Sequence, residues 1–341
     1  MRRPDYQRLD PQRSGHQRLR HPLAAPLLAL TLLTGCSYGD KPAKQVEVAV
    51  QGLYSAAVSA DGRYGVVGSI QHGGSLWDLQ SGERQFNWNH NKDGFSDLVA
   101  AAFSPEGDYA ITAGQQDMVL WQVADGQSVG FWNAPAGILD VALSPGGNLA
   151  LLGLENNTAL YFDIKNGGLK HTLRHQGRVR SVAVSDDGDW ALTGSDDNRA
   201  RLWDLITGEL VHSVEHGNGV NSVALSPNGQ FAFSAGQLDK ALIWRTGSGQ
   251  VYQTLTTDES WIPQRISYTS ARFSSNSDQL LTGTSSGLVQ LWNVADGTEL
   301  RRWQVHKREQ FRPTSASLYG LGFATRGYYA IASNGFVNQL K

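Results

Sequence analysis

The sequence has a single cysteine, Cys36, among its 341 residues. One thiol excludes a disulfide within the chain and any metal site built from several cysteines. The chain also lacks an excess of charge of one sign, because 29 basic and 31 acidic residues give a net charge of −2. Its N-terminal apolar run, from Pro22 to Leu33, has about 12 residues, whereas a helix that spans a bilayer needs about 20.

The near balance of charge hides an asymmetry between the N-terminal segment and the rest of the chain. Residues 1–35 contain six arginines and two acidic residues. The remaining residues carry 23 basic and 29 acidic side chains and are mildly acidic. A nucleic-acid-binding protein usually presents an excess of basic side chains. The composition therefore argues against a nucleic-acid partner.

The N-terminal segment has the three parts of a secretory signal peptide: a basic start, a short apolar run and small residues before a cleavage point. The residues at that point, Leu33-Thr34-Gly35-Cys36, resemble the lipobox of bacterial lipoproteins. The resemblance implies that residues 1–35 are removed and that a lipid is attached to Cys36. Residues 36–43 would then form a lipidated tether that leads into the periplasm, and Ser37 favours the outer over the inner membrane. The other interpretation is an ordinary signal peptide or membrane anchor with an incidental cysteine.

Beyond residue 50 the chain repeats a turn motif of serine, two variable residues and glycine. The motif begins at Ser59, Ser104, Ser144, Ser185 and Ser226, with degenerate copies at Ser274 and Ala324. Successive copies lie 40 to 50 residues apart. Each copy contains alternating apolar segments separated by turn residues, which predicts four short strands. Four strands in a period of about 40 residues are typical of a β-propeller blade.

The repeats resemble the WD-repeat family over residues 44–341. Trp203-Asp204 and Trp77-Asp78 are W-D pairs, and His175 and His216 precede their strands as the family's histidine does. The resemblance implies a buried hydrogen-bonded tetrad in the fourth copy, made by His175, Thr193, Asp197 and Trp203. Other copies depart from the pattern, because Phe162 replaces the tryptophan of the third copy and the sixth copy lacks the histidine and the aspartate.

Seven copies of three strands can be counted, and the last copy ends without its fourth strand. The alternating segment of residues 45–50 precedes the first copy. We expect it to supply the missing strand, since closing a ring removes exposed sheet edges. The sequence thus predicts an all-β fold with one seven-bladed propeller at 44–341, closed by its N-terminal strand.

Two patterns that resemble metal motifs have simpler explanations. His171 and His175, like His212 and His216, are four residues apart, but both pairs fall at the ends of predicted strands rather than on a helix. Asp186-Asp187-Gly188-Asp189 aligns with the repeated turn and lacks the rest of a calcium loop. We therefore expect no metal and no cofactor, and no set of residues stands out as catalytic.

Three of the connections from an outer strand to the next inner strand are long: residues 88–97, 256–269 and 305–318. Such connections share one face of a propeller. They carry aromatic and arginine side chains, which are enriched at protein-binding hot spots. The candidate partner-binding residues are Trp88, Phe95, Trp261, Arg265, Tyr268, Phe311 and Arg312.

Three classes of function follow from these features. The favoured one is a non-enzymatic scaffold or assembly subunit that binds protein partners at a membrane of the cell envelope. The second is an enzyme with a site at the propeller channel, acting on glycans or lactones. The third is an outer-membrane assembly factor. The fold alone does not decide between them.

Overall fold

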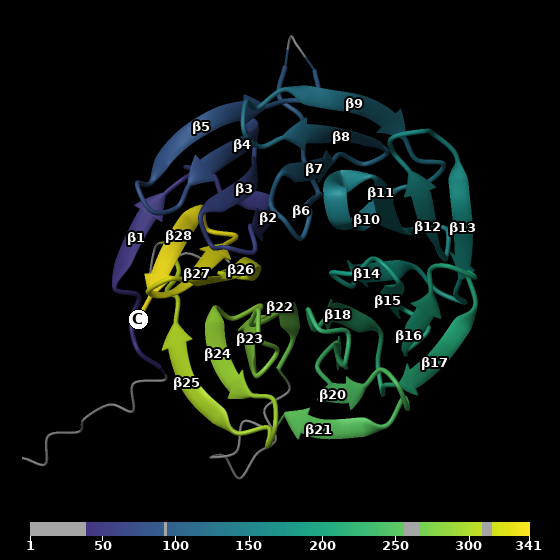
Figure 1. The fold of residues 1–341 in the computed structure, drawn as a ribbon. Helices are drawn as coiled ribbons and strands as arrows, with labels where there is room; N and C mark the ends of the chain where they lie inside the picture. The colour runs from purple at the N-terminus through teal and green to yellow at the C-terminus, as the bar shows by residue number, and fades with distance from the viewer. Residues whose placement is uncertain (1–38, 92–93, 256–265, 309–315) are drawn as a thin grey trace, which may run out of the picture. The chain divides into compact units, whose positions relative to one another are not determined.

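The computed structural model describes residues 39–91, 94–255, 266–308 and 316–341. These residues form seven four-stranded antiparallel sheets that succeed one another around a ring (Figure 1). The prediction of an all-β, seven-bladed propeller is confirmed. The one helical element of the described residues is a 3-10 turn, η1 (Pro145–Gly147). Cys36 and the predicted signal peptide lie outside the described residues.

Six blades are built from consecutive strands, numbered from the channel outward. Blade one contains β2 (Leu53–Val58), β3 (Tyr64–Ser69), β4 (Gly73–Asp78) and β5 (Glu83–Trp88). Blade two contains β6 (Ala100–Phe103), β7 (Tyr109–Ala113), β8 (Asp117–Gln122) and β9 (Ser128–Asn133). Blade three contains β10 (Ile138–Leu143), β11 (Leu149–Leu154), β12 (Thr158–Asp163) and β13 (Leu169–Arg174).

The second half of the ring repeats this order. Blade four contains β14 (Val179–Val184), β15 (Trp190–Ser195), β16 (Arg199–Asp204) and β17 (Leu210–Glu215). Blade five contains β18 (Val220–Leu225), β19 (Phe231–Gly236), β20 (Ala241–Arg245) and β21 (Val251–Leu255). Blade six contains β22 (Tyr268–Phe273), β23 (Gln279–Thr284), β24 (Leu288–Asn293) and β25 (Glu299–Gln304). Blade seven contains β26 (Leu318–Ala324), β27 (Gly327–Ala332), β28 (Phe336–Leu340) and β1 (Lys44–Glu47).

The repeated serine explains why each blade turns at the same place. In blade one the Ser59 hydroxyl oxygen accepts a hydrogen bond from the Tyr64 amide at 2.9 Å and donates its proton to Asp61 at 2.6 Å. The glycine of the motif, Gly62, has a φ of +70°, a conformation that costs glycine little and other residues more. The serines at the start of the other five serine-containing turns accept the same amide bond: Ser104, Ser144, Ser185, Ser226 and Ser274.

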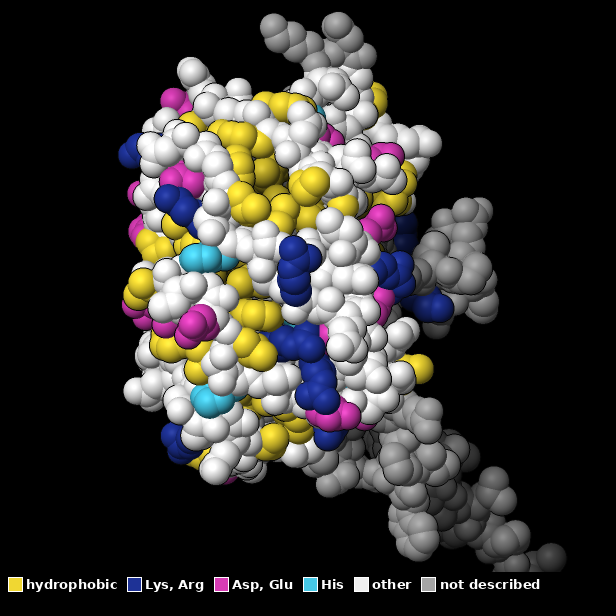
Figure 2. Space-filling model, turned by 90° about the vertical axis from the view of Figure 1, so that its right-hand side faces the viewer, with side chains coloured by type: hydrophobic (Ala, Val, Ile, Leu, Met, Phe, Trp, Pro, Cys, Tyr) yellow, Lys and Arg dark blue, Asp and Glu magenta, His cyan; other side chains and the backbone are white. Residues whose placement is uncertain are grey.

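The core lies between the blades rather than in a single centre. Each large cluster of buried side chains joins two neighbouring sheets: one, for example, packs Ile111 and Leu120 of blade two against Leu152 and Leu154 of blade three. The outer strands face solvent and leave single apolar side chains exposed, such as Leu169 on β13 and Leu210 on β17. On this side of the ring, apolar side chains reach the surface with Lys and Arg between them (Figure 2).

The ring closes as the sequence predicts, through pairing of the two ends of the chain. Strand β1 is antiparallel to β28, with Lys44 opposite Gln339 and Glu47 opposite Phe336. The strand is shorter than the predicted segment 45–50. The amides of Val48 and Ala49 both bond to the carbonyl of Gly335, so the backbone leaves the ladder there and runs toward β2.

The Arg308 side chain holds residues 44–50, the closing segment, in place. It belongs to the long connection after β25. Its Nη1 donates to the carbonyls of Ala49 at 3.0 Å and Val50 at 2.6 Å, and its Nη2 pairs with the Glu47 carboxylate. The guanidinium also lies 5.2 Å from the centre of the Phe336 ring. One side chain thus ties the connection after blade six to residues 47–50 and to β28 of blade seven.

We predict that Arg308→Met lowers the free energy of unfolding by about 2–3 kcal/mol, because several charge-assisted hydrogen bonds to the closing segment are lost. Thermal or urea denaturation measures the effect. The neighbouring Lys307, which is exposed, provides the matched control: Lys307→Met should change stability by less than about 0.5 kcal/mol. Equal stabilities of the two variants would show that Arg308 does not hold the closure.

Candidate functional site

The structure brings the four predicted tetrad residues of blade four into one hydrogen-bonded chain. Trp203 Nε1 donates to Thr193 Oγ1 at 2.8 Å, and Thr193 Oγ1 lies 2.7 Å from His175 Nε2. His175 Nδ1 lies 3.1 Å from the Asp197 carboxylate. An indole can only donate and a carboxylate can only accept a hydrogen bond. We therefore infer that the Thr193 hydroxyl donates to His175 Nε2 and that the imidazole proton is on Nδ1, which donates to Asp197.

The charge states in this chain follow from its burial. Loss of solvent, reinforced by the nearby Arg201 guanidinium, lowers the pKa of His175 to about 4. Burial alone would raise the pKa of Asp197, but hydrogen bonds from the Gln176 amide and from Arg201 outweigh it and lower that pKa. The tetrad is therefore a neutral imidazole next to an ionised carboxylate, which suits a structural link between strands.

Blade two contains a second tetrad, which the sequence analysis missed. His90 Nδ1 pairs with the Asp117 carboxylate and its Nε2 lies 2.8 Å from Thr112 Oγ1, to which Trp121 also donates at 2.8 Å. The long connection after β5 separates His90 from its strand. The sequence did contain one sign of this second tetrad. The spacing from Thr112 to Trp121 is only one residue shorter than the spacing from Thr193 to Trp203.

Blade five has an incomplete version of the same chain. His216 Nε2 lies 2.9 Å from Ser234 Oγ, which accepts a hydrogen bond from Trp244 at 3.1 Å. Asp239 is 3.7 Å from His216 Nδ1, and this nitrogen has no hydrogen-bond partner within the described residues. Burial lowers the pKa of His216 to about 4.

The structure corrects two of the predicted partner-binding residues. Trp88 is the last residue of β5 and is fully buried; it stacks on Trp121 with ring centres 5.3 Å apart. Tyr268 is the first residue of β22, is 3% exposed, and meets Phe233 edge to face. Both are strand residues whose side chains point between blades, so neither can form part of an exposed binding face. Trp261, Arg265, Phe311 and Arg312 lie outside the described residues.

Phe95 is the predicted residue that the structure places at the surface, with 63% of its area exposed. It borders a groove of about 710 Å³ beside the closing segment. Its ring meets His72 edge to face at 5.5 Å, and Val50, 66% exposed, lines the same groove. We call this the closure groove and define it by Val50, His72, Asn87, Asn89 and Phe95.

The closure groove contains an unused hydrogen-bond acceptor. Asn89 Oδ1 is buried and has no partner among the described residues. Leaving such a group unsatisfied costs about 1–3 kcal/mol. The oxygen packs against Gly73, where an added Cβ would lie only 1.6 Å from it, so a glycine is required at that position.

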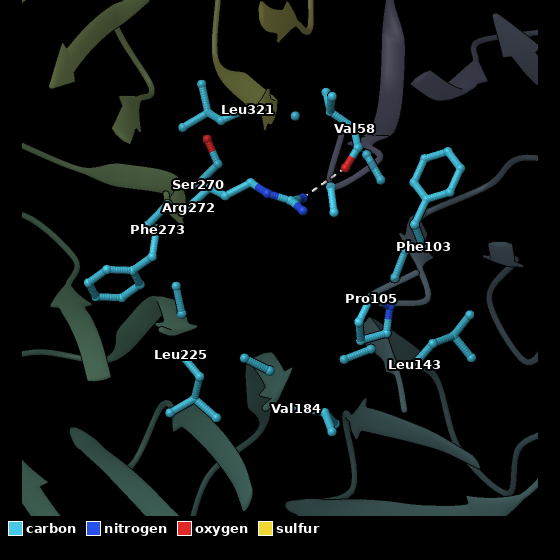
Figure 3. A pocket seen from close by; sticks show the side chains of 18 of the residues that line it. Val58, Phe103, Pro105, Leu143, Val184, Leu225, Ser270, Arg272, Phe273 and Leu321 are labelled. Atoms are coloured by element: carbon cyan, nitrogen blue, oxygen red, sulfur yellow. Dashed lines mark hydrogen bonds between the residues drawn. The ribbon is translucent and has the colours of Figure 1, made fainter. Parts of the chain in front are cut away.

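The channel through the ring is a second hollow and is lined mainly by small apolar side chains. It holds about 380 Å³ and is bordered by the inner strand of every blade. Arg272 of β22 extends into it and donates from Nη1 to the carbonyl of Val58 at 2.8 Å (Figure 3). Burial raises the pKa of Asp186, at the edge of the channel, although Arg272 opposes this effect. Through its hydrogen bond to Val58, the Arg272 guanidinium links blade six to blade one.

Comparison with known protein families settles the identity of the repeat. The WD domain, G-beta repeat family matches residues 167–204, 208–245 and 249–293. The chain contains WD40 repeats. Each matched segment of this WD40 propeller covers the outer strand of one blade and the three inner strands of the next. No curated protein matches the chain.

Neither a cluster of metal ligands nor a membrane-spanning helix is found in the described residues. In the ranges that the structure describes, no three histidine, cysteine, aspartate or glutamate side chains gather as metal ligands. In the same ranges, no helix has the length and apolar character needed to cross a membrane.

We predict that acid weakens the WD40 propeller through its buried histidines. Because the native pKa of His216 is about 4 and an unfolded histidine titrates near 6.5, only the unfolded chain gains a proton between these values. Stability therefore falls as pH drops through this window. His216→Gln should reduce the loss between pH 6.5 and pH 5 by about 1.5 kcal/mol, measured by urea denaturation at each pH.

Asp140 provides a control of opposite sign. It bridges blades three and four by accepting the Val182 amide at 2.9 Å, and burial raises its pKa to about 6. Its native form keeps a proton that the unfolded chain loses, so it contributes stability that disappears as pH rises from about 4 to 6. Asp140→Asn should make the loss on acidification steeper. The assignment is wrong if both variants shift the pH dependence in the same direction.

Proposed function

We propose that this WD40 propeller is a non-enzymatic binding scaffold of the bacterial cell envelope. In this proposal a lipid on Cys36 holds the chain at a membrane, and the propeller captures a partner protein in the periplasm. The outer membrane is favoured by Ser37. The lipobox resemblance at Leu33–Cys36 and the short apolar run before it support the anchor.

The closure groove is the observation that supports protein binding most directly. Two apolar side chains, Phe95 and Val50, are more than 60% exposed on its borders. Exposed apolar side chains at the border of a groove are features that a binding partner would cover. A segment of a partner protein would supply apolar side chains to cover Phe95 and Val50.

We predict that the anchor depends on the thiol. Cys36→Ala should leave an uncleaved or soluble protein that no longer partitions into the detergent phase, because no lipid can be attached. Detergent phase separation and mass spectrometry of the N-terminus measure both effects. If the variant is processed and partitions with membranes as the unsubstituted protein does, the lipid anchor is contradicted.

We predict that the double change Phe95→Ser and Val50→Ser weakens partner capture at least tenfold, because two apolar anchors are lost, while the melting temperature stays within about 2 °C. Crosslinking in intact cells followed by purification from membranes measures capture. Ile206, 74% exposed on a turn outside the closure groove, is the matched control, and Ile206→Ser should retain capture. Undiminished capture by the folded double variant would place the partner elsewhere.

A further inference from the structure

The chain joins the propeller at Asp40, which is closer to Cys36 than the predicted tether of residues 36–43 implies. Asp40 forms a bridge with Trp303 of β25: its amide donates to the Arg302 carbonyl at 3.0 Å, and its carbonyl accepts the Gln304 amide at 2.9 Å. Gly39 packs closely against the same strand, since an added Cβ would lie 2.9 Å from the backbone carbon of Trp303. The described chain therefore begins at the circumference of blade six.

This attachment sets the reach of the anchor. Three residue steps separate Cys36 from Gly39, and a fully extended chain covers at most about 3.6 Å per residue. Cys36 can therefore lie no more than about 11 Å from Gly39. A lipid on Cys36 would hold this part of the rim close to the level of the lipid headgroups.

The rim at this point carries charges that suit anionic headgroups. We define the tether rim as Gly39–Lys44 together with β25. Lys41 and Lys44 are exposed and pair with no carboxylate among the described residues. The carboxylates nearby are already compensated, since Asp40 pairs with Arg301 and Glu299 with Arg302. Leu300 adds an apolar side chain that is 48% exposed.

We propose that the tether rim is the membrane-facing surface of the protein and binds anionic phospholipid headgroups, so that the propeller stands edge-on to the bilayer. The inference rests on the proposed lipid anchor and adds its orientation. In Figure 1, β1 and β25 lie on the opposite side of the ring from β13. Blade three therefore points away from the membrane, and the two flat faces of the ring both open to the periplasm.

The test compares lysines on the two sides of the ring in the lipidated protein. The protein is purified from membranes and reconstituted into vesicles of phosphatidylcholine alone or with phosphatidylglycerol. A membrane-impermeant amine-reactive ester is then added, and mass spectrometry measures labelling of each lysine. Lys165, which is exposed in blade three, is the matched control, and Lys170, which is exposed there but pairs with Asp163 at 3.3 Å, is a second control. Labelling of the same protein in detergent gives the reference rates.

On vesicles with phosphatidylglycerol, Lys41 and Lys44 should react at least fivefold more slowly than the control lysines, as expected for about 1 kcal/mol of headgroup attraction per lysine. Protection should be weaker on phosphatidylcholine alone. Equal protection on both vesicles would overturn the binding of anionic headgroups. Labelling as fast as that of Lys165 in a protein that floats with the vesicles would overturn the orientation while leaving the anchor intact. Failure to float would contradict the anchor itself, and the inference with it.

Discussion

The pairing of β1 with β28 is the constraint on which the rest of the molecule depends. Every other sheet of the ring is built from four consecutive strands, but blade seven takes its outer strand from the other end of the chain. The sequence repeat is offset from the structural blade by one strand, as the matched WD segments show. This offset leaves a single outer strand, β1, at the N-terminal end of the repeat array and an open edge on β28 at the other end, and joining the two closes the ring without an exposed edge.

The closure also shapes the candidate binding surface. Arg308, in the connection after blade six, donates hydrogen bonds to the carbonyls of Ala49 and Val50. The side chain of Val50 lies at the border of the closure groove. The groove thus combines the closing segment with the inserted connection that carries Phe95. A partner seated there would contact both, and its binding would favour the closed ring by mass action.

The fold could be predicted almost completely from the sequence, because the repeated serine turns and alternating strands are local signals. The candidate site could be predicted only in part. The tetrad of blade four follows the spacing of the repeat and could be found: His175, Thr193, Asp197 and Trp203. In blade two an insertion moves His90 away from its strand in the sequence, although its contact with Thr112 matches the contact of His175 with Thr193. Trp88 was assigned to a loop because sequence does not show where a strand ends. Its neighbours and its stacking on Trp121 depend on contacts between blades.

The distance along the chain between β1 and β28 also concerns the order in which the protein is made. Gln45 hydrogen-bonds Asn338 across a separation of 293 residues. At synthesis rates of about 5–20 residues per second, the first strand waits about 15–60 seconds before its partner exists. During that interval the four residues of β1, with Lys44 and Glu47 at its ends, have no partner strand. Its shortness and its charges are the features by which natural proteins keep such an edge from pairing with another chain.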